Sequence, residues 1–169
     1  MKKMILSALA LAGFALNSNA QATATATATA TIVTPISISR TADMNFGNVA
    51  VSATTGGTVI LAPAGTRTTG GAGGVTLPAT AGTVTAAAFT VNGNGSYTYA
   101  ITLPSTVTLT RASGTETMTA GTFTSTPSGT GTLSSGTQNL TVGATLTVAA
   151  AQVAGVYSSG NFNVTVNYN

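Results

Sequence analysis

Apolar and polar residues alternate strictly near both ends of this chain. In residues 22–31, Ala and Thr alternate without a break, and Ile32 and Val33 continue the pattern. Near the other end, Phe162, Val164, Val166 and Tyr168 alternate with Asn and Thr residues. A period of two is the pattern of a β-strand whose two faces differ. The sequence therefore predicts an extended segment near its start and a strand with one apolar face at its end.

Shorter strand-like runs lie between these two segments and are separated by Gly, Pro and Asn residues. The predicted runs cover residues 58–61, 87–91, 97–103, 107–110, 118–124, 139–148 and 161–168. Short strands at such spacing are typical of a β-sandwich or a small barrel. Residues 149–154 are the one place where a short helical turn is predicted.

The composition supports an all-β fold. The 169 residues include 36 Thr, 29 Ala and 20 Gly, which together make up half of the chain. Leu, Glu, Lys and Arg, which favour helices, are scarce, whereas Thr and Val favour strands. Because 43% of the residues are hydrophobic and the mean hydropathy is +0.39, the chain also differs from highly charged disordered sequences.

The first twenty residues have the organisation of a secretory signal peptide. Lys2 and Lys3 precede an apolar stretch at residues 4–16, and a small-residue cleavage site ends at Ala20. The apolar stretch is shorter than the roughly 20 residues that span a bilayer. We therefore expect an exported protein that passes through the periplasm to the cell surface or medium, with no stable membrane insertion.

Few charged side chains remain after the predicted cleavage. They are Arg40, Asp43, Arg67, Arg111 and Glu116, with a formal net charge of +1. Three scattered Arg residues cannot form the cationic surface that nucleic-acid binding requires, which excludes a nucleic-acid partner. Asp43 and Glu116 are expected to be solvated or paired with a nearby Arg.

Candidate chemistry for an enzyme is lacking in this sequence. It contains no Cys and no His, and no Lys follows Lys3, so no Ser has a partner base and no nitrogen or sulfur metal ligand of the usual kind is present. We therefore expect no enzymatic activity, no cofactor and no metal. Tyr97 and Tyr99 share one face of a predicted strand; packing is the favoured interpretation, and a sugar-binding pair is the alternative.

Three segments carry a resemblance to known families. Residues 155–169, with a penultimate Tyr and Gly155 about fourteen residues before the end, resemble the C-terminal strand of chaperone–usher pilus subunits. Residues 32–38 are similar to the donor-strand region of the cysteine-free, CS1-like branch of those pilins. Together with residues 41–49, they also resemble an uncharacterised secreted bacterial family known only as a domain of unknown function, over nearly the whole mature chain.

The pilin resemblance implies an immunoglobulin-like β-sandwich of about seven strands that lacks one strand. A periplasmic chaperone would fill the open groove, and at an outer-membrane usher the N-terminal extension of the next subunit would replace it. The implied organisation is a signal peptide at 1–20, an extension at 21–34 and a β-sandwich at 35–169. The implied donor-strand residues are Ala22, Ala24, Ala26, Ala28, Ala30 and Ile32, and the implied edge of the acceptor groove is Phe162, Val164, Val166 and Tyr168.

The Ala/Thr segment has three interpretations: a donor strand, a linker, or a strand paired within its own domain. As a donor, its five Ala methyl groups would contribute roughly 4 kcal/mol. Ordering ten residues costs on the order of 10 kcal/mol or more. Ladder hydrogen bonds and Ile32 would have to supply the difference.

The sequence as a whole predicts a structural subunit of a bacterial surface fibre that polymerises with itself by donor-strand exchange. The alternative is a monomeric secreted β-sandwich that binds a glycan or a surface partner. Thr-X-Thr arrays such as Thr106/Thr108/Thr110 also suggest an ice-binding face, but their starts are spaced too irregularly for stacked coils, and solvent-facing Thr on ordinary strands explains them.

Overall fold

The computed structural model describes residues 21–169, so the predicted signal peptide at 1–20 lies outside the described residues. The chain divides into two units, Met1–Ile32 and Val33–Asn169. In the first unit, residues 21–32 form neither strand nor helix, and their side chains are exposed. Alternation alone does not produce a strand, because a strand also needs a ladder partner, and Ala methyl groups bury too little surface to order one.

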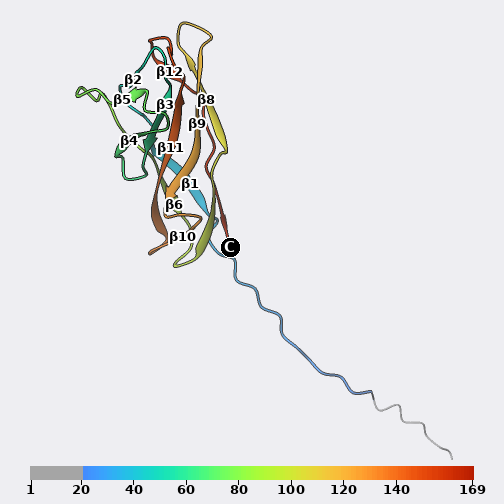
Figure 1. Cartoon of the computed structure of the whole chain (residues 1–169). Helices are drawn as coiled ribbons and strands as arrows, with labels where there is room; N and C mark the ends of the chain where they lie inside the picture. The colour runs from blue at the N-terminus through green and yellow to red at the C-terminus, as the bar shows by residue number, and fades with distance from the viewer. Residues whose placement is uncertain (1–20) are drawn as a thin grey trace, which may run out of the picture. The chain divides into compact units, whose positions relative to one another are not determined.

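The second unit is built from antiparallel strands (Figure 1). No helix occurs between residues 21 and 169, and hence none that is long and apolar enough to cross a membrane. The strands are β1 (Ser37–Ala42), β2 (Ala50–Val51), β3 (Gly57–Leu61), β4 (Arg67–Gly70), β5 (Val75–Thr76), β6 (Ala87–Asn92), β7 (Thr98–Thr102), β8 (Thr106–Arg111), β9 (Thr117–Thr126), β10 (Thr130–Thr132), β11 (Thr137–Val148), β12 (Tyr157–Ser158) and β13 (Thr165–Tyr168).

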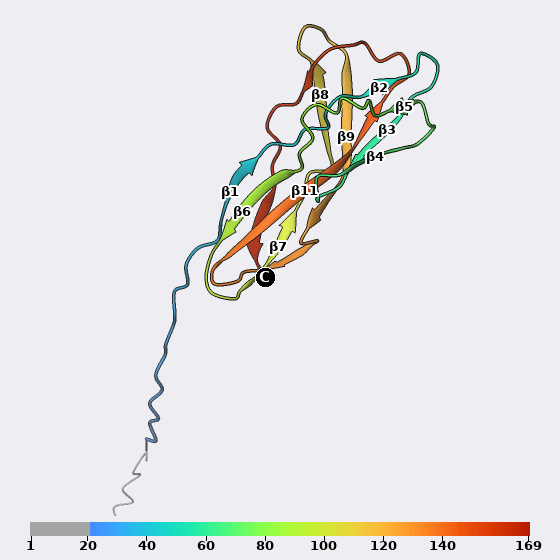
Figure 2. The same ribbon diagram turned by 90° about the vertical axis from the view of Figure 1, so that its left-hand side faces the viewer.

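The largest sheet has the order β1-β6-β11-β9-β8-β12; in addition, β3 pairs with β11, and β4 pairs with β3. β11 is its central strand. On one edge, residues 137–142 pair with β6 and residues 144–148 pair with β3; on the other edge, residues 141–147 pair with β9. A second sheet has the order β10-β7-β13, and β2 pairs with β5 (Figure 2).

Two groups of buried side chains form the interior. In one, β6 and β11 of the large sheet contribute Val91, Leu140 and Val142, which pack with Tyr99 of β7 and Val166 of β13. This group therefore joins the two larger sheets. The other group lies over the far half of β11 and contains Phe46, Val59, Leu61, Val75, Ala120, Ala144, Leu146 and Val148.

Most of the predicted strand positions are confirmed. Six of the predicted runs coincide with β3, β6, β7, β8, β9 and β11, and β1 begins shortly after Pro35. The predicted helical turn at 149–154 is wrong: residues 150–151 form a turn in which Ala151 has φ +51°, and its N–H donates to the Ser52 carbonyl. The last predicted strand, 161–168, is regular only in β13, although its side chains alternate between buried and exposed from Phe162 onward.

The Thr-X-Thr arrays lie on the outward face of the large sheet. Thr106, Thr108 and Thr110 are exposed on β8, while Val107 and Leu109 between them are half-buried. The strand registers place Thr108 opposite Thr119, Thr119 opposite Thr147, and Thr147 opposite Thr58. Ordinary strand alternation therefore accounts for these residues.

Tyr99 is fully buried, and its packing depends on a glycine. Its hydroxyl donates to Gln138 Oε1 at 2.8 Å, and the same oxygen accepts from the Thr132 N–H at 2.9 Å. Burial raises the pKa of the Tyr99 hydroxyl. Gly131 of β10 lies opposite Tyr99, and a Cβ at that position would overlap the Tyr99 ring.

We expect Gly131→Ala to destabilise the domain by about 1–3 kcal/mol, the usual cost of overpacking a filled interior. Urea unfolding measures this change. Gly160→Ala is the matched control, because a Cβ at Gly160 meets no atom within 4 Å and no positive φ opposes it; its stability should stay within about 0.5 kcal/mol of the wild type. Equal stability of the two variants would contradict the assigned packing of Tyr99.

Candidate binding groove

The two edges of the large sheet leave a groove between them. Its volume is about 1340 Å³. One side is formed by residues 42–51, which follow edge strand β1 and are called the first wall here. The other side is formed by residues 152–162, which include edge strand β12 and are called the second wall. The sheet therefore curls so that its edges face one another across an unfilled space.

The floor of the groove is apolar. It consists of side chains from β6, β8, β9 and β11: Ala87, Phe89, Val107, Leu109, Met118, Ala120, Phe123, Leu146 and Val148. Several of these side chains are only half-buried, including Phe89, Leu109 and Met118. An interior surface of the sheet thus remains partly open to solvent, which is uncommon in a domain that functions alone.

Two strands that adjoin the walls have an unpaired edge. Among residues 21–169, β1 pairs only with β6, and β13, which follows the second wall in the sequence, pairs only with β7. β1 and β13 come into contact, and the Tyr168 hydroxyl donates to the Thr34 carbonyl at 2.8 Å. Unpaired backbone N–H and C=O groups at strand edges are sites where another strand can add.

The first wall is held from behind by Arg67 of β4. Its Nη1 donates to the carbonyl oxygens of Phe46 at 2.5 Å and Asn48 at 2.7 Å, and its Nη2 donates to the Ala81 carbonyl at 3.4 Å. The Asn48 N–H also donates to the Ala81 carbonyl, at 2.7 Å. Arg67 itself does not line the groove.

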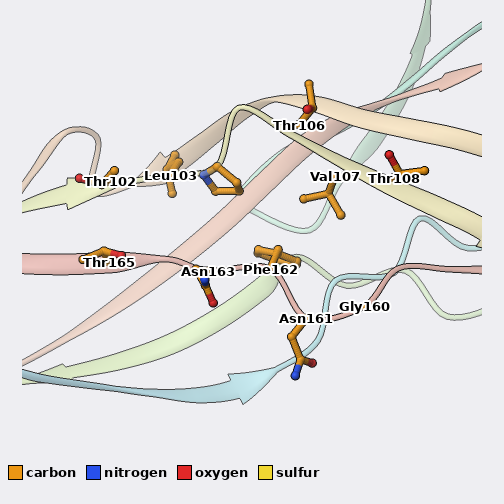
Figure 3. A pocket seen from close by; sticks show the side chains of 11 residues that line it. Thr102, Leu103, Thr106, Val107, Thr108, Gly160, Asn161, Phe162, Asn163 and Thr165 are labelled. Carbon is orange, nitrogen blue, oxygen red and sulfur yellow. The ribbon is translucent and has the colours of Figure 1, made fainter.

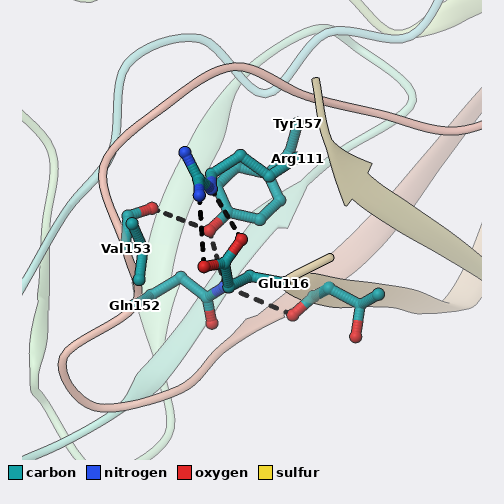
Figure 4. Close-up of polar contacts among 6 residues, drawn as sticks. Arg111, Glu116, Gln152, Val153 and Tyr157 are labelled. Atoms are coloured by element: carbon teal, nitrogen blue, oxygen red, sulfur yellow. Dashed lines mark hydrogen bonds and ion pairs between the residues drawn. The ribbon is translucent and has the colours of Figure 1, made fainter. Parts of the chain in front are cut away.

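The second wall is attached to the β8–β9 hairpin by a polar cluster (Figure 4). Arg111 Nε donates to Glu116 Oε2 at 2.7 Å. Gln152 Nε2 donates to the Tyr157 hydroxyl at 2.8 Å and, more weakly, to the Thr117 carbonyl. The Tyr157 hydroxyl in turn donates to the Val153 carbonyl at 2.7 Å. The Gln152 side chain thereby joins the wall to the hairpin, in addition to the pairing of β12 with β8.

Three of the five charged side chains between residues 21 and 169 lie at the groove or contact one of its walls: Arg40 and Asp43 line it, and Arg67 donates to the first wall. Arg40 and Asp43 form an exposed ion pair at 2.6 Å in the lining of the groove. Glu116 pairs with Arg111, so both carboxylates pair with a nearby Arg, which is one of the two placements that the sequence predicts. The hydrogen bond from Arg111 is the main reason that the pKa of Glu116 is lowered, and the same bond raises the pKa of Arg111. In a chain with so few charges, this placement marks the groove as the candidate functional site.

A smaller cavity of about 530 Å³ lies beside the second wall, between β8 and residues 160–165 (Figure 3). Phe162 and Val107 point toward one another across it, whereas Asn161 and Asn163 point away. Phe162 lines both cavities, and its ring lies 5.6 Å from that of Phe123, measured between centroids. Phe162 is therefore one of four residues that border both spaces, together with Val107, Gly160 and Asn161.

The four predicted acceptor residues take different places. Phe162 lines the groove. Val164, Val166 and Tyr168 pack into the interior between the two larger sheets, with Val166 only 7% exposed. The predicted donor residues Ala22, Ala24, Ala26, Ala28, Ala30 and Ile32 are exposed and belong to the other unit of the chain.

The aromatic pair singled out from the sequence does not form a surface site. Tyr99 lies in the interior, and the exposed Tyr97 packs on Tyr168 with ring centroids 5.6 Å apart. Within residues 21–169, no three His, Cys, Asp or Glu side chains come together as metal ligands would. The site residues that the sequence did not reveal are Arg67, Gln152 and Tyr157, since most of their partners are backbone carbonyls.

Comparison with known proteins identifies one family. The family described as Domain of unknown function (DUF4402) matches residues 36–168. No curated protein and no solved structure matches the chain. These comparisons therefore give no support to the resemblance to chaperone–usher pilins.

We expect the folded domain to lose stability in acid through Glu116. Its pKa is lowered in the folded state from the ordinary 4.5, so the contribution of the Arg111–Glu116 pair is present above pH 4.5 and is lost as the pH falls through the lower folded pKa. Thermal unfolding between pH 7 and pH 3 measures this loss. Glu116→Gln should flatten the acid side of the profile, whereas the control Asp43→Asn, which alters an exposed pair, should retain it. An unchanged profile in Glu116→Gln would disprove the assignment.

Proposed function

We propose a function for this chain, which belongs to the DUF4402 family, from the geometry of its groove: it is an exported structural subunit of a surface fibre. The groove receives the N-terminal segment of a second copy, residues 22–32, as an added β-strand. The observation that carries this proposal is the space between the two walls, which is bordered by strands with unpaired edges and floored by apolar side chains.

The size of the groove favours a polypeptide over a small molecule. Its volume of about 1340 Å³ exceeds the roughly 300–1,000 Å³ of ordinary ligand pockets. An extended segment of residues 21–32 would be about 40 Å long at 3.3 Å per residue. The first wall supplies residues 42–51 to one side of the groove. The volume of the groove therefore suits a polypeptide segment better than a single small molecule.

The chemistry of the segment also suits this position. It has no charged side chain, and it contains no Pro that would remove a ladder donor. Its Ala methyl groups would contribute roughly 4 kcal/mol, and about ten ladder hydrogen bonds at about 1 kcal/mol each would add about 10 kcal/mol. The total of about 14 kcal/mol is of the same order as the cost of ordering ten residues, which is on the order of 10–20 kcal/mol.

This proposal interprets the fold as an immunoglobulin-like sandwich that lacks one strand. The large sheet and the β10-β7-β13 sheet would be its two layers, and the added segment would complete the layer edge at β13. An open apolar groove is an aggregation hazard during export. The proposal therefore includes a periplasmic chaperone that covers the groove and an outer-membrane usher at which the chaperone is exchanged for the next subunit.

Deleting residues 21–31 should leave a folded domain that no longer forms fibres by itself. The deletion removes the proposed donor strand but no strand of the Val33–Asn169 unit. Negative-stain electron microscopy and boiling-resistant ladders on gels detect fibres, and circular dichroism checks the fold. Clean monomers from both the full mature chain and the deletion would refute the fibre proposal and favour a monomeric secreted binding domain.

A charge placed in the groove should block assembly without unfolding the subunit. Val156 lines the second wall and is 74% exposed, so Val156→Asp should cost little stability but would put an unpaired carboxylate against the incoming strand. Ile60→Asp is the matched control, since Ile60 is also exposed, at 42%, but does not line the groove. Fibre yield should fall sharply in Val156→Asp only. Equal fibre yields from the two variants would place the assembly contact elsewhere.

A further inference from the structure

Arg67 differs from the other two Arg residues between residues 21 and 169 in what it contacts. Arg40 and Arg111 each pair with a carboxylate, whereas no carboxylate within the described residues lies at ion-pair distance from Arg67. Its guanidinium group instead donates to three backbone carbonyls, those of Phe46, Asn48 and Ala81. Because the hydrogen bonds of this half-buried guanidinium group go to backbone oxygens, the group fixes the position of that backbone.

The first wall has little regular structure to hold its shape. Between β1 and β2, its ladder contact is the isolated bridge from Asn45 to Thr85. Gly47 in this stretch has φ +70°, and a Cβ there would overlap the Ala81 carbonyl and lie 2.9 Å from Arg67 Nη1. The backbone at Gly47 therefore lies close to the guanidinium group, and a larger residue at this position would not fit.

We infer that Arg67 is a positioning residue that forms the first wall before any strand enters the groove. The planar guanidinium fork fixes several carbonyls in one arrangement, which the single ammonium group of Lys does not reproduce. The entering strand then meets a wall that is already shaped, so that less of its binding free energy is spent on ordering the acceptor. This role rests on the proposed function, since it concerns the same groove.

The two walls are thus held by different chemistry. The second wall is joined to the β8–β9 hairpin by the pairing of β12 with β8 and by Gln152, whose Nε2 donates to the Thr117 carbonyl. The first wall is held by the Arg67 guanidinium group, which donates to backbone carbonyls. The role of Arg67 can therefore be tested separately from the contacts of the second wall.

Amide hydrogen exchange of the mature chain tests the wall itself. In Arg67→Lys, we expect the amide of Asn48, which donates to the Ala81 carbonyl, to exchange about tenfold faster, while the amide of Leu140 in the central strand keeps its protection. Thr69→Ser is the control, since Thr69 is exposed on the same strand as Arg67 and does not line the groove, and it should leave both amides unchanged. Unchanged exchange at Asn48 in Arg67→Lys, or unfolding of the whole domain in both Arg67→Lys and Arg67→Gln, would overturn the inference.

Binding of a labelled peptide with the sequence of residues 21–34 tests the consequence for the groove. Arg67→Lys should weaken binding about tenfold, mainly through slower association, relative to the wild type and Thr69→Ser. Equal affinity and equal association rates in all three proteins would also overturn the inference. If the wild type does not bind the peptide, the proposed function fails, and the hydrogen exchange result still decides whether Arg67 orders the wall.

Discussion

The backbone ladder of β11 is the interaction on which the rest of the domain depends. Both edges of this 12-residue strand are paired, to β6 and β3 on one side and to β9 on the other. Its inward side chains enter both buried groups, Leu140 and Val142 in one and Leu146 and Val148 in the other. In a chain of small side chains, main-chain pairing of this kind compensates for the limited apolar surface that each residue can bury.

Period-two alternation made the all-β class and most strand positions predictable from the sequence. It is a local signal, so it located β6, β8 and β11 well and also gave the inward direction of Phe162 and Val166. At 149–154 the sequence was misleading for another reason: the Ala residues suggested a helical turn, but a turn with Ala151 at φ +51° connects β11 to the second wall. The alternation in residues 22–31 likewise indicated which side chains would share a face of a strand, but it did not indicate which strand would pair with this segment.

The groove itself could not be predicted, because it arises from contacts that are distant in sequence. The first wall accepts hydrogen bonds from Arg67 through its backbone carbonyls, so these contacts do not depend on which side chains stand at positions 46 and 48. The second wall is joined to the hairpin by Gln152, whose side chain donates to the Thr117 carbonyl, 35 residues earlier in the sequence. An isolated Arg in an otherwise uncharged strand was the one available signal, and the sequence alone gave it no partner.

The concentration of charge around the groove leaves the outward face of the large sheet covered by hydroxyl groups, such as the row from Thr108 across Thr119 and Thr147 to Thr58. Such a surface is hydrated by dipoles and carries almost no long-range field, so dissolved salt has little to screen on it. Neighbouring copies are then kept apart by the hydration of threonine hydroxyls rather than by mutual repulsion. The colloidal behaviour of this protein should accordingly be nearly the same in dilute buffer and in brine.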